Sequence, residues 1–514
     1  MKFYQRLYSS DNIQTGDIDN YLDNTTFTST LTDDDANLCE GNFKLKELTE
    51  AIQEMKTNKS PGLDGLTVEF YKQFWPLLGD LLTLSFNESF EENELSNSQK
   101  ISALSLIYKK GDPSSLENWR PISLLNVDYK IAARTLANRL KKVIHKIVHL
   151  DQQGYIKNRF IGYNLRQIQD IIDYTDSLQL EGAILFIDFR KAFDTVEWNF
   201  LYNVLHKFGF KNSFITWIKV LYSDCKSCIF NYGYKSKLFN PFRGIRQGCP
   251  ISALLYILAA EVLATNIRNS EDVTGIEINV SNEKRFLKIT QLADDTTLFL
   301  KKESDIISAL KILKTFGNCS GLKLNENKTE GMWIGKNKFD KNPVGGISWP
   351  DRPIKALGVY FGHNKEECIN LNWENKLTAC QHIIDNWSKR TLTLYGKVQI
   401  IKTLLIPKFT YLFHSLNVPK SILNKINSML YAFLWSGKRE KIKRNTLIGS
   451  KIHGGIEMVD LESFIITIKL KWIRALTSAE DANWKLIPKY YNVLSKLWKQ
   501  FLSFLFKFRQ HKKY

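Results

Sequence analysis

Two adjacent aspartates, Asp294 and Asp295, interrupt the apolar run LADDTTLFL at residues 292–300. Such a run is typical of a buried strand, and an unpaired charge is too costly to bury in one. The chain must therefore turn here, so that the carboxylates face water at a hairpin tip, or bring positive charge to them. These residues alone leave both interpretations open.

A third carboxylate, Asp188, directly follows the apolar run AILFI at 183–187. Carboxylates that meet at the ends of two strands repel each other unless cations lie between them, and oxygen ligands suit Mg²⁺. Two such ions can hold the attacking and leaving oxygens of a phosphoryl transfer, as in polymerases. We therefore interpret Asp188, Asp294 and Asp295 as candidate metal ligands and keep the hairpin tip as the alternative.

The composition is that of a globular protein with several subdomains, with 514 residues of which 44% are hydrophobic. No apolar stretch approaches the length of a membrane span, and residues 1–6 lack the apolar core of a signal peptide. We expect an intracellular protein, in the nucleus or the cytoplasm, that does not bind a membrane. Of seven cysteines only Cys225 and Cys228 form a CxxC, too few ligands for a structural zinc site, so we expect free thiols.

The net charge of +18 is concentrated in the last quarter of the chain. Residues 386–514 hold 24 of the 71 Lys and Arg residues but only 6 of the 53 Asp and Glu residues, and the rest of the chain is neutral. Basic and aromatic side chains are interleaved there, as in WSKRTLTLYGK at 387–397, and a basic run, KREKIKR, follows at 438–444. This pattern favours binding to a polyanion, most simply nucleic acid, with a solvated basic face as the alternative.

The pattern of elements changes along the chain. Residues 1–41 are acidic and polar and are expected to form a partly ordered lead-in, whereas residues 42–365 mix helices with strands and residues 366–514 are helical. This order indicates an α+β body with an α-helical appendage. We predict helices at 66–78, 79–92, 127–148 and 196–207, and strands at 103–108, 226–232 and 236–241.

A series of short motifs follows in a defined order: NWRPISLLN at 118–126, LANRL at 136–140, QQGY at 152–155, IDFRKAFD at 187–194, RQGCPIS at 246–252, ADD at 293–295, GLKLN at 321–325, KTE at 328–330 and LGV at 357–359. Each motif alone is weak, but the ordered set, within residues 42–362, is specific. In this order they resemble the reverse transcriptase of LINE-type (non-LTR) retrotransposons.

The resemblance implies a right-hand polymerase fold, with fingers and palm (an antiparallel sheet plus helices) over 42–365 and a basic helical thumb with a C-terminal extension over 366–514. It implies an RNA-directed DNA polymerase, a nucleotidyltransferase that extends a DNA primer on an RNA template with dNTPs. Two Mg²⁺ ions are the implied cofactors, with Mn²⁺ as a substitute.

The resemblance also implies a role for individual residues. Asp188 and Asp294 would hold both ions, and Asp295 would complete the cluster. By the same resemblance, Lys109 and Arg120 would bind the triphosphate, and Gln247 and Gly248 would line the nucleotide pocket. Phe193 would act as a steric gate that excludes a 2′-hydroxyl, and Lys328 would protonate the departing pyrophosphate. Leu357 and Gly358 would form the turn that holds the primer end.

From the residues alone, each of these assignments has a structural alternative. Phe193 could be a core residue, Lys109 and Lys328 solvated loop charges, and the turn at 244–248 an ordinary start of a helix. Asp194 is interpreted as structural, as the N-cap of a helix that begins near Thr195.

Two departures from the family pattern are small: Leu292 stands where an aromatic residue is usual, and Ser252-Ala253 replaces the more usual Ser-Pro. Full-length elements of this kind also carry an endonuclease ahead of the polymerase, for which the short lead-in leaves no room, and an RNA-binding partner is expected outside this chain. We therefore expect a polymerase piece of a larger element. The alternatives are a catalytically silent, nucleic-acid-binding remnant and a host-type or intron-encoded reverse transcriptase; the stretch 119–124 favours the retrotransposon.

Overall fold

Four antiparallel strands form the central sheet of the protein, in the order β10-β3-β9-β8. The computed structural model describes residues 1–280, 283–340 and 342–491. The strands of this sheet, here called the palm sheet, are β3 (Glu181–Ile187), β8 (Ile289–Leu292), β9 (Asp295–Leu300) and β10 (Glu330–Gly335).

The palm sheet separates two hydrophobic cores, because successive side chains of a strand point to opposite faces. In β3, Ala183, Leu185 and Ile187 pack into one core, whereas Ile184 and Phe186 pack into the other. All five are buried, which explains why the sequence of β3 is apolar without interruption over these residues. The two faces of the sheet thus border two separate lobes.

The first lobe contains a second sheet in the order β2-β1-β4-β5, in which β1 and β4 are parallel. Its strands are β1 (Ile101–Tyr108), β2 (Trp119–Leu124), β4 (Lys226–Asn231) and β5 (Tyr234–Lys235). The helices of this lobe are α1 (Lys2–Leu7), α2 (Thr15–Asp23), α3 (Asp33–Asn37), α4 (Leu45–Glu54), α5 (Val68–Glu91), α6 (Asn97–Lys100), η1 (Leu116–Asn118), α7 (Val127–Ile147), α9 (Ala192–Thr195), α10 (Trp198–Lys207), α11 (Asn212–Tyr222), α12 (Ser252–Asn269) and α13 (Glu303–Ser320).

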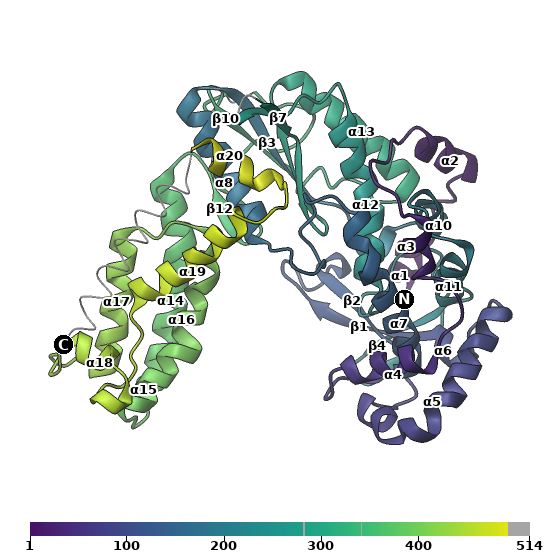
Figure 1. Ribbon diagram of the computed structural model, residues 1–514, viewed down its shortest axis with the longest axis horizontal. Coiled ribbons are helices and arrows are strands. Elements are labelled where there is room, and N and C mark those ends of the chain that lie inside the picture. Colours follow the sequence, from purple (N-terminus) through teal and green to yellow (C-terminus); the bar gives the residue numbers. More distant parts are fainter. Residues whose placement is uncertain (281–282, 341, 492–514) are drawn as a thin grey trace.

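The second lobe is helical and begins with α14 (Lys365–Ser388), shown in green in Figure 1. Its hydrophobic core also contains residues of α8 (Gly162–Leu178) and of two strand pairs. These pairs are β6 (Ile276–Val280) with β7 (Glu283–Leu287) and β11 (Ile354–Ala356) with β12 (Val359–Phe361). Its other helices are α15 (Leu394–Ile400), η2 (Ile401–Leu405), α16 (Ile406–Ser415), α17 (Lys420–Trp435), α18 (Arg444–Ile448), η3 (Lys451–His453), α19 (Leu461–Leu476), η4 (Asn483–Lys485) and α20 (Leu486–Tyr490).

These features confirm the expected fold class, an α+β right hand with a palm sheet, mixed fingers and a helical thumb (Figure 1). The domain boundaries at 42 and 366 stay a prediction. In the described part of the chain, no helix combines the length and the apolar character that a bilayer crossing requires.

Three local expectations differ from the structure. The strand expected at 236–241 does not form: β4 pairs instead with the two-residue β5, and Phe239 makes only an isolated bridge with Ser227. The helices expected at 66–78 and 79–92 form one helix, α5, which continues through Pro76; Thr67 caps its start by accepting from the Phe70 N–H. The lead-in is more ordered than expected, because it forms three short helices and buries Ile18 and Leu22 in the first core.

Candidate active site

The three candidate carboxylates lie at one end of the palm sheet. β3 and β9 pair antiparallel with Ile187 opposite Thr296, so Asp188 and Asp295 occupy the next position of the same register. β8 and β9 pair up to Leu292 and Asp295, which leaves Ala293 and Asp294 as a two-residue turn. The doubled aspartate is therefore at a hairpin tip, and that tip lies beside Asp188.

The electrostatics of the turn indicate mutual repulsion among the carboxylates. Desolvation is the largest cause that raises the pKa of Asp294, and Asp188 adds to it while Lys109 and Arg120 oppose it. Desolvation, followed by the charges of Asp294 and Asp188, raises the pKa of Asp295 to about 6. A cation near these groups would relieve the repulsion.

The donor set fits a divalent cation. Asp188 is half-buried and its Oδ2 accepts from Asn325 Nδ2 at 2.8 Å, whereas Asp294 and Asp295 reach solvent. Within the described ranges, no three His, Cys, Asp or Glu side chains gather closely enough to hold a metal ion by themselves. Mg²⁺ is usually held by one or two carboxylates together with water and substrate phosphates, and these aspartates supply ligands of that type.

Two of the predicted cations face the carboxylates. Lys109 directly follows β1, and its N–H donates to the Asn118 carbonyl at 2.9 Å; Arg120 in β2 pairs with Ile107. Both side chains are exposed, and both lower the pKa of Asp294. The β1–β2 hairpin thus directs positive charge at the end of the palm sheet.

Lys328 lies in an exposed turn before β10 and belongs to a group of cations that also contains Lys191. Burial, with Lys328 and Lys109 as smaller causes, lowers the pKa of Lys191, and its Nζ donates to the Trp119 carbonyl at 2.9 Å. Sequence reasoning missed Lys191, although it lies inside the IDFRKAFD motif.

Phe193 is half-buried and stacks on Tyr256 of α12, with ring centroids 4.7 Å apart and an interplanar angle of 10°. Tyr256 is fully buried, and its pKa is raised by burial and then by Asp294 and Asp295. One face of Phe193 thus rests on the core, close to the carboxylates.

Gln247 and Gly248 form a turn that is fixed to β2. The Ser123 N–H donates to the Gln247 carbonyl at 2.7 Å. Gly248 has φ +112°, and a Cβ there would lie 2.9 Å from the Ser123 carbonyl oxygen, so only glycine fits. The Gln247 amide donates to both carboxylate oxygens of Asp194, at 3.0 and 3.1 Å.

The prediction that Asp194 is a helix N-cap is wrong. It lies inside the short helix α9, and Glu197 precedes α10 instead. Asp194 is fully buried, which raises its pKa to about 6, and it accepts from Gln247 and from the Tyr8 hydroxyl at 2.9 Å. Tyr8, in the lead-in, thus supports the nucleotide-pocket turn through Asp194, a contact that no local pattern indicates.

The predicted primer turn lies between β11 and β12. Leu357 and Gly358 have φ +50° and +79°, and Tyr411 of thumb helix α16 donates its hydroxyl to the Leu357 carbonyl at 2.5 Å. Burial is the largest cause that raises the pKa of Tyr411 to about 12, and the charge of Asp295 adds to it. Tyr411 is a further residue that sequence reasoning missed.

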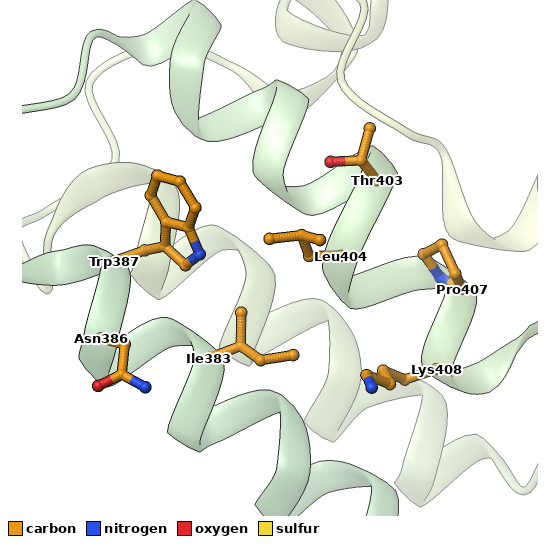
Figure 2. Close-up of a pocket in the computed structure, with 7 residues that line it drawn as sticks. All are labelled: Ile383, Asn386, Trp387, Thr403, Leu404, Pro407 and Lys408. Carbon is orange, nitrogen blue, oxygen red and sulfur yellow. The ribbon is translucent and has the colours of Figure 1, made fainter. Parts of the chain in front are cut away.

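A separate hollow of about 430 Å³ lies within the thumb. Figure 2 shows Ile383 and Trp387 of α14 on one side and Leu404, Pro407 and Lys408 of η2 and α16 on the other. None of the predicted site residues lines it.

We expect Asp295→Asn to stabilise the protein at pH 7.5 in the absence of divalent cations. A carboxyl whose pKa rises on folding, here from 3.8 to about 6, destabilises the folded state progressively as pH rises through that window. Allowing for its solvent exposure, removal of the charge should raise the free energy of unfolding by about 1 kcal/mol at pH 7.5 and by nothing at pH 3.

Denaturation midpoints of the wild type and Asp295→Asn, measured with a chelator at both pH values, test this expectation. Asp272→Asn, at an exposed aspartate that precedes β6, is the matched control and should leave the midpoint unchanged. An Asp295→Asn protein that is no more stable than the wild type at pH 7.5 would contradict the repulsion.

Comparisons with known proteins find similarity to one family model and to proteins of transposable elements. Residues 107–361 match the family model described as "Reverse transcriptase (RNA-dependent DNA polymerase)". The chain is 30% identical to the transposon TX1 uncharacterized 149 kDa protein of Xenopus laevis, over 97% of this chain and 37% of the relative. It is 23% identical to the Pol polyprotein of an R2 element of Popillia japonica (73% and 53%) and 25% identical to the RNA-directed DNA polymerase from mobile element jockey of Drosophila melanogaster (74% and 42%).

Among solved structures, telomerase from Candida tropicalis in complex with a telomeric RNA fragment gives a TM-score of 0.40 at 10% identity, over 83% of this chain and 68% of the other. The chain spans between 37% and 53% of the length of the three curated relatives described above.

Proposed function

We propose, from the premise that this chain belongs to the reverse transcriptases of LINE-type (non-LTR) retrotransposons, that it is an RNA-directed DNA polymerase. It would extend a DNA primer on an RNA template with dNTPs. The observation that carries the proposal is the meeting of Asp188 with the Asp294-Asp295 turn at one end of the palm sheet, opposite Lys109 and Arg120.

In this proposal Asp188 and Asp294 hold two Mg²⁺ ions, with Mn²⁺ as a substitute, and Asp295 completes the cluster. The ions supply charge neutralisation and activation of the primer hydroxyl. The raised pKa values of Asp294 and Asp295 support this assignment, because a nearby cation would stabilise their charged forms. Asn325 holds one oxygen of Asp188, which leaves the other free to bind.

The other predicted residues would bind and orient the nucleotide. Lys109 and Arg120 would neutralise the β- and γ-phosphates, and their lowering of the Asp294 pKa supports this role. Gln247 and Gly248 would form the wall of the nucleotide pocket, on a turn that is hydrogen-bonded to Ser123 and Asp194. Lys328 would donate a proton to the departing pyrophosphate, beside the positive charge of Lys191.

A primer-extension assay tests the activity. The purified chain, an RNA template with an annealed DNA primer, dNTPs and Mg²⁺ should give extended product that disappears with a chelator. A folded sample that binds the duplex but gives no Mg²⁺-dependent product would overturn the proposal and favour the catalytically silent remnant.

We also propose that the thumb follows the template–primer backbone, largely without reading sequence. The loop between α17 and α18 carries four exposed cations, Lys438, Arg439, Lys441 and Lys443. The neighbouring Arg444 is already engaged, because it stacks on Tyr431, 4.1 Å from the ring centroid, and pairs with Glu440.

Changing the four exposed cations of this loop to Glu should weaken duplex binding and flatten its salt dependence. Each lost phosphate contact lowers the slope of log K against log salt by about 0.7–0.9. Affinity is measured between low and moderate salt, with a charge-preserving Lys/Arg exchange at the same positions as the control. Unchanged affinity and slope in the Glu variant would show that the loop is only a solvated face.

A further inference from the structure

A short segment of the chain, residues 151–154, lies against the catalytic hairpin. The Gln291 N–H donates to the Asp151 carbonyl at 2.9 Å, and the Gln153 N–H donates to the Gln291 carbonyl at 2.8 Å. Gln152 and Gln291 thus form an isolated parallel bridge, which attaches the segment to the palm sheet beside β8. The bridge at Gln291 lies two residues before Ala293, the first residue of the turn.

The Gln152 side chain holds both backbone groups of Ala293. Its Oε1 accepts from the Ala293 N–H at 2.8 Å and from the Gly154 N–H at 2.8 Å, and its Nε2 donates to the Ala293 carbonyl at 3.4 Å. Gln152 is only 1% exposed, so water does not replace these contacts. Buried backbone groups need partners, and here one primary amide supplies them.

The backbone that Gln152 holds is an unusual one. Ala293 has φ +55°, a left-handed conformation that a residue with a Cβ rarely adopts. The Gly154 backbone also packs closely against Ala293, because a Cβ on Gly154 would lie 2.6 Å from the Ala293 nitrogen. This conformation immediately precedes Asp294 and Asp295, so it sets the direction in which both carboxylates leave the sheet.

We propose that Gln152 is a positioning residue of the polymerase reaction, whose side-chain amide holds the Ala293–Asp294 turn so that both aspartates stand beside Asp188. The proposal rests on the proposed function for its kinetic consequence. Gln152 acts through Ala293 and touches no substrate. Its neighbour Gln153 is also buried, but its side chain bonds only within the segment between α7 and α8, to the Leu150 carbonyl and the Phe160 N–H.

The test compares Gln152→Met with Gln153→Met, since methionine preserves length and volume and removes the amide. In primer extension, Gln152→Met should lower kcat about 100-fold, because small misplacement of catalytic groups has effects of that size. Its KM for dNTP and its duplex affinity should stay within about twofold, while Gln153→Met stays within about threefold in kcat. An equal loss in both variants, or no loss in Gln152→Met, would overturn the proposal.

Hydrogen exchange of the Ala293 amide is the readout that does not require activity. Exchange should be at least about tenfold faster in Gln152→Met than in the wild type and unchanged in Gln153→Met. If the wild type extends no primer, the proposed function fails, and exchange still decides whether Gln152 holds the turn. If Gln152→Met does not fold, Gln152→Glu replaces it, because it keeps the acceptor oxygen. Slow exchange of the Ala293 amide in this variant supports the proposal, and fast exchange overturns it.

Discussion

Asp294→Asn should lower the rate of primer extension at least about 1,000-fold while it leaves the fold and duplex binding intact. Losses of this size are typical when a group that stabilises transition-state charge is removed. The asparagine keeps the shape of the turn but not the charge, and it removes one source of the repulsion that raises the pKa of Asp295. Single-turnover extension with Mg²⁺ measures the effect, and duplex affinity and the denaturation midpoint are measured alongside it.

The matched control is again Asp272→Asn, which makes the same chemical change at an exposed aspartate outside the palm sheet. It should extend a primer at the wild-type rate. Undiminished product from Asp294→Asn would remove this carboxylate from the reaction and with it the two-ion interpretation of the site.

Phe193→Val should reduce the preference for dNTPs over rNTPs roughly 100-fold, an effect of the size expected when a pocket wall loses several carbon atoms. Phe193 stacks on the buried Tyr256 and is itself only half-buried, so the core supports the ring while part of the side chain stays exposed. Removing the ring opens room for a 2′-hydroxyl, so we expect rNTP incorporation to rise more than dNTP incorporation falls.

Competing incorporation of matched dNTP and rNTP measures this ratio. Phe193→Tyr, which keeps the ring and its stacking, should keep the wild-type preference. If Phe193→Val changes dNTP and rNTP incorporation equally, Phe193 is a packing residue and not a gate.

Local sequence patterns predicted much of this architecture. The apolar runs that end at Asp188 and surround Asp294 form β3 and β9, because alternation and burial are encoded in short stretches. The long helix α7 and strand β1 also match their predictions at 127–148 and 103–108 within two residues. The split of α5 was wrong, since a proline in a long helix is tolerated when both sides continue to pack.

The contacts that support the site were not predictable in this way. Tyr8 reaches Asp194 across 186 residues of chain, and Gln152 reaches Ala293 across 141. Each bond depends on how segments pack after they fold, and a polar side chain gives no local sign of its partner. Asp194 was therefore recognised as structural but assigned the wrong structure, a helix cap instead of a buried acceptor.

By itself, the sequence determined which residues carry charge at the ends of apolar runs, the order of the motifs and the basic character of the thumb. These are properties of short stretches and survive without any knowledge of packing. Only the tertiary structure decided that the doubled aspartate forms a turn beside Asp188, that the Gln247 amide is held by Asp194, and that Gln152 supports Ala293. The reason is strand register and long-range packing, which bring together side chains far apart in the chain.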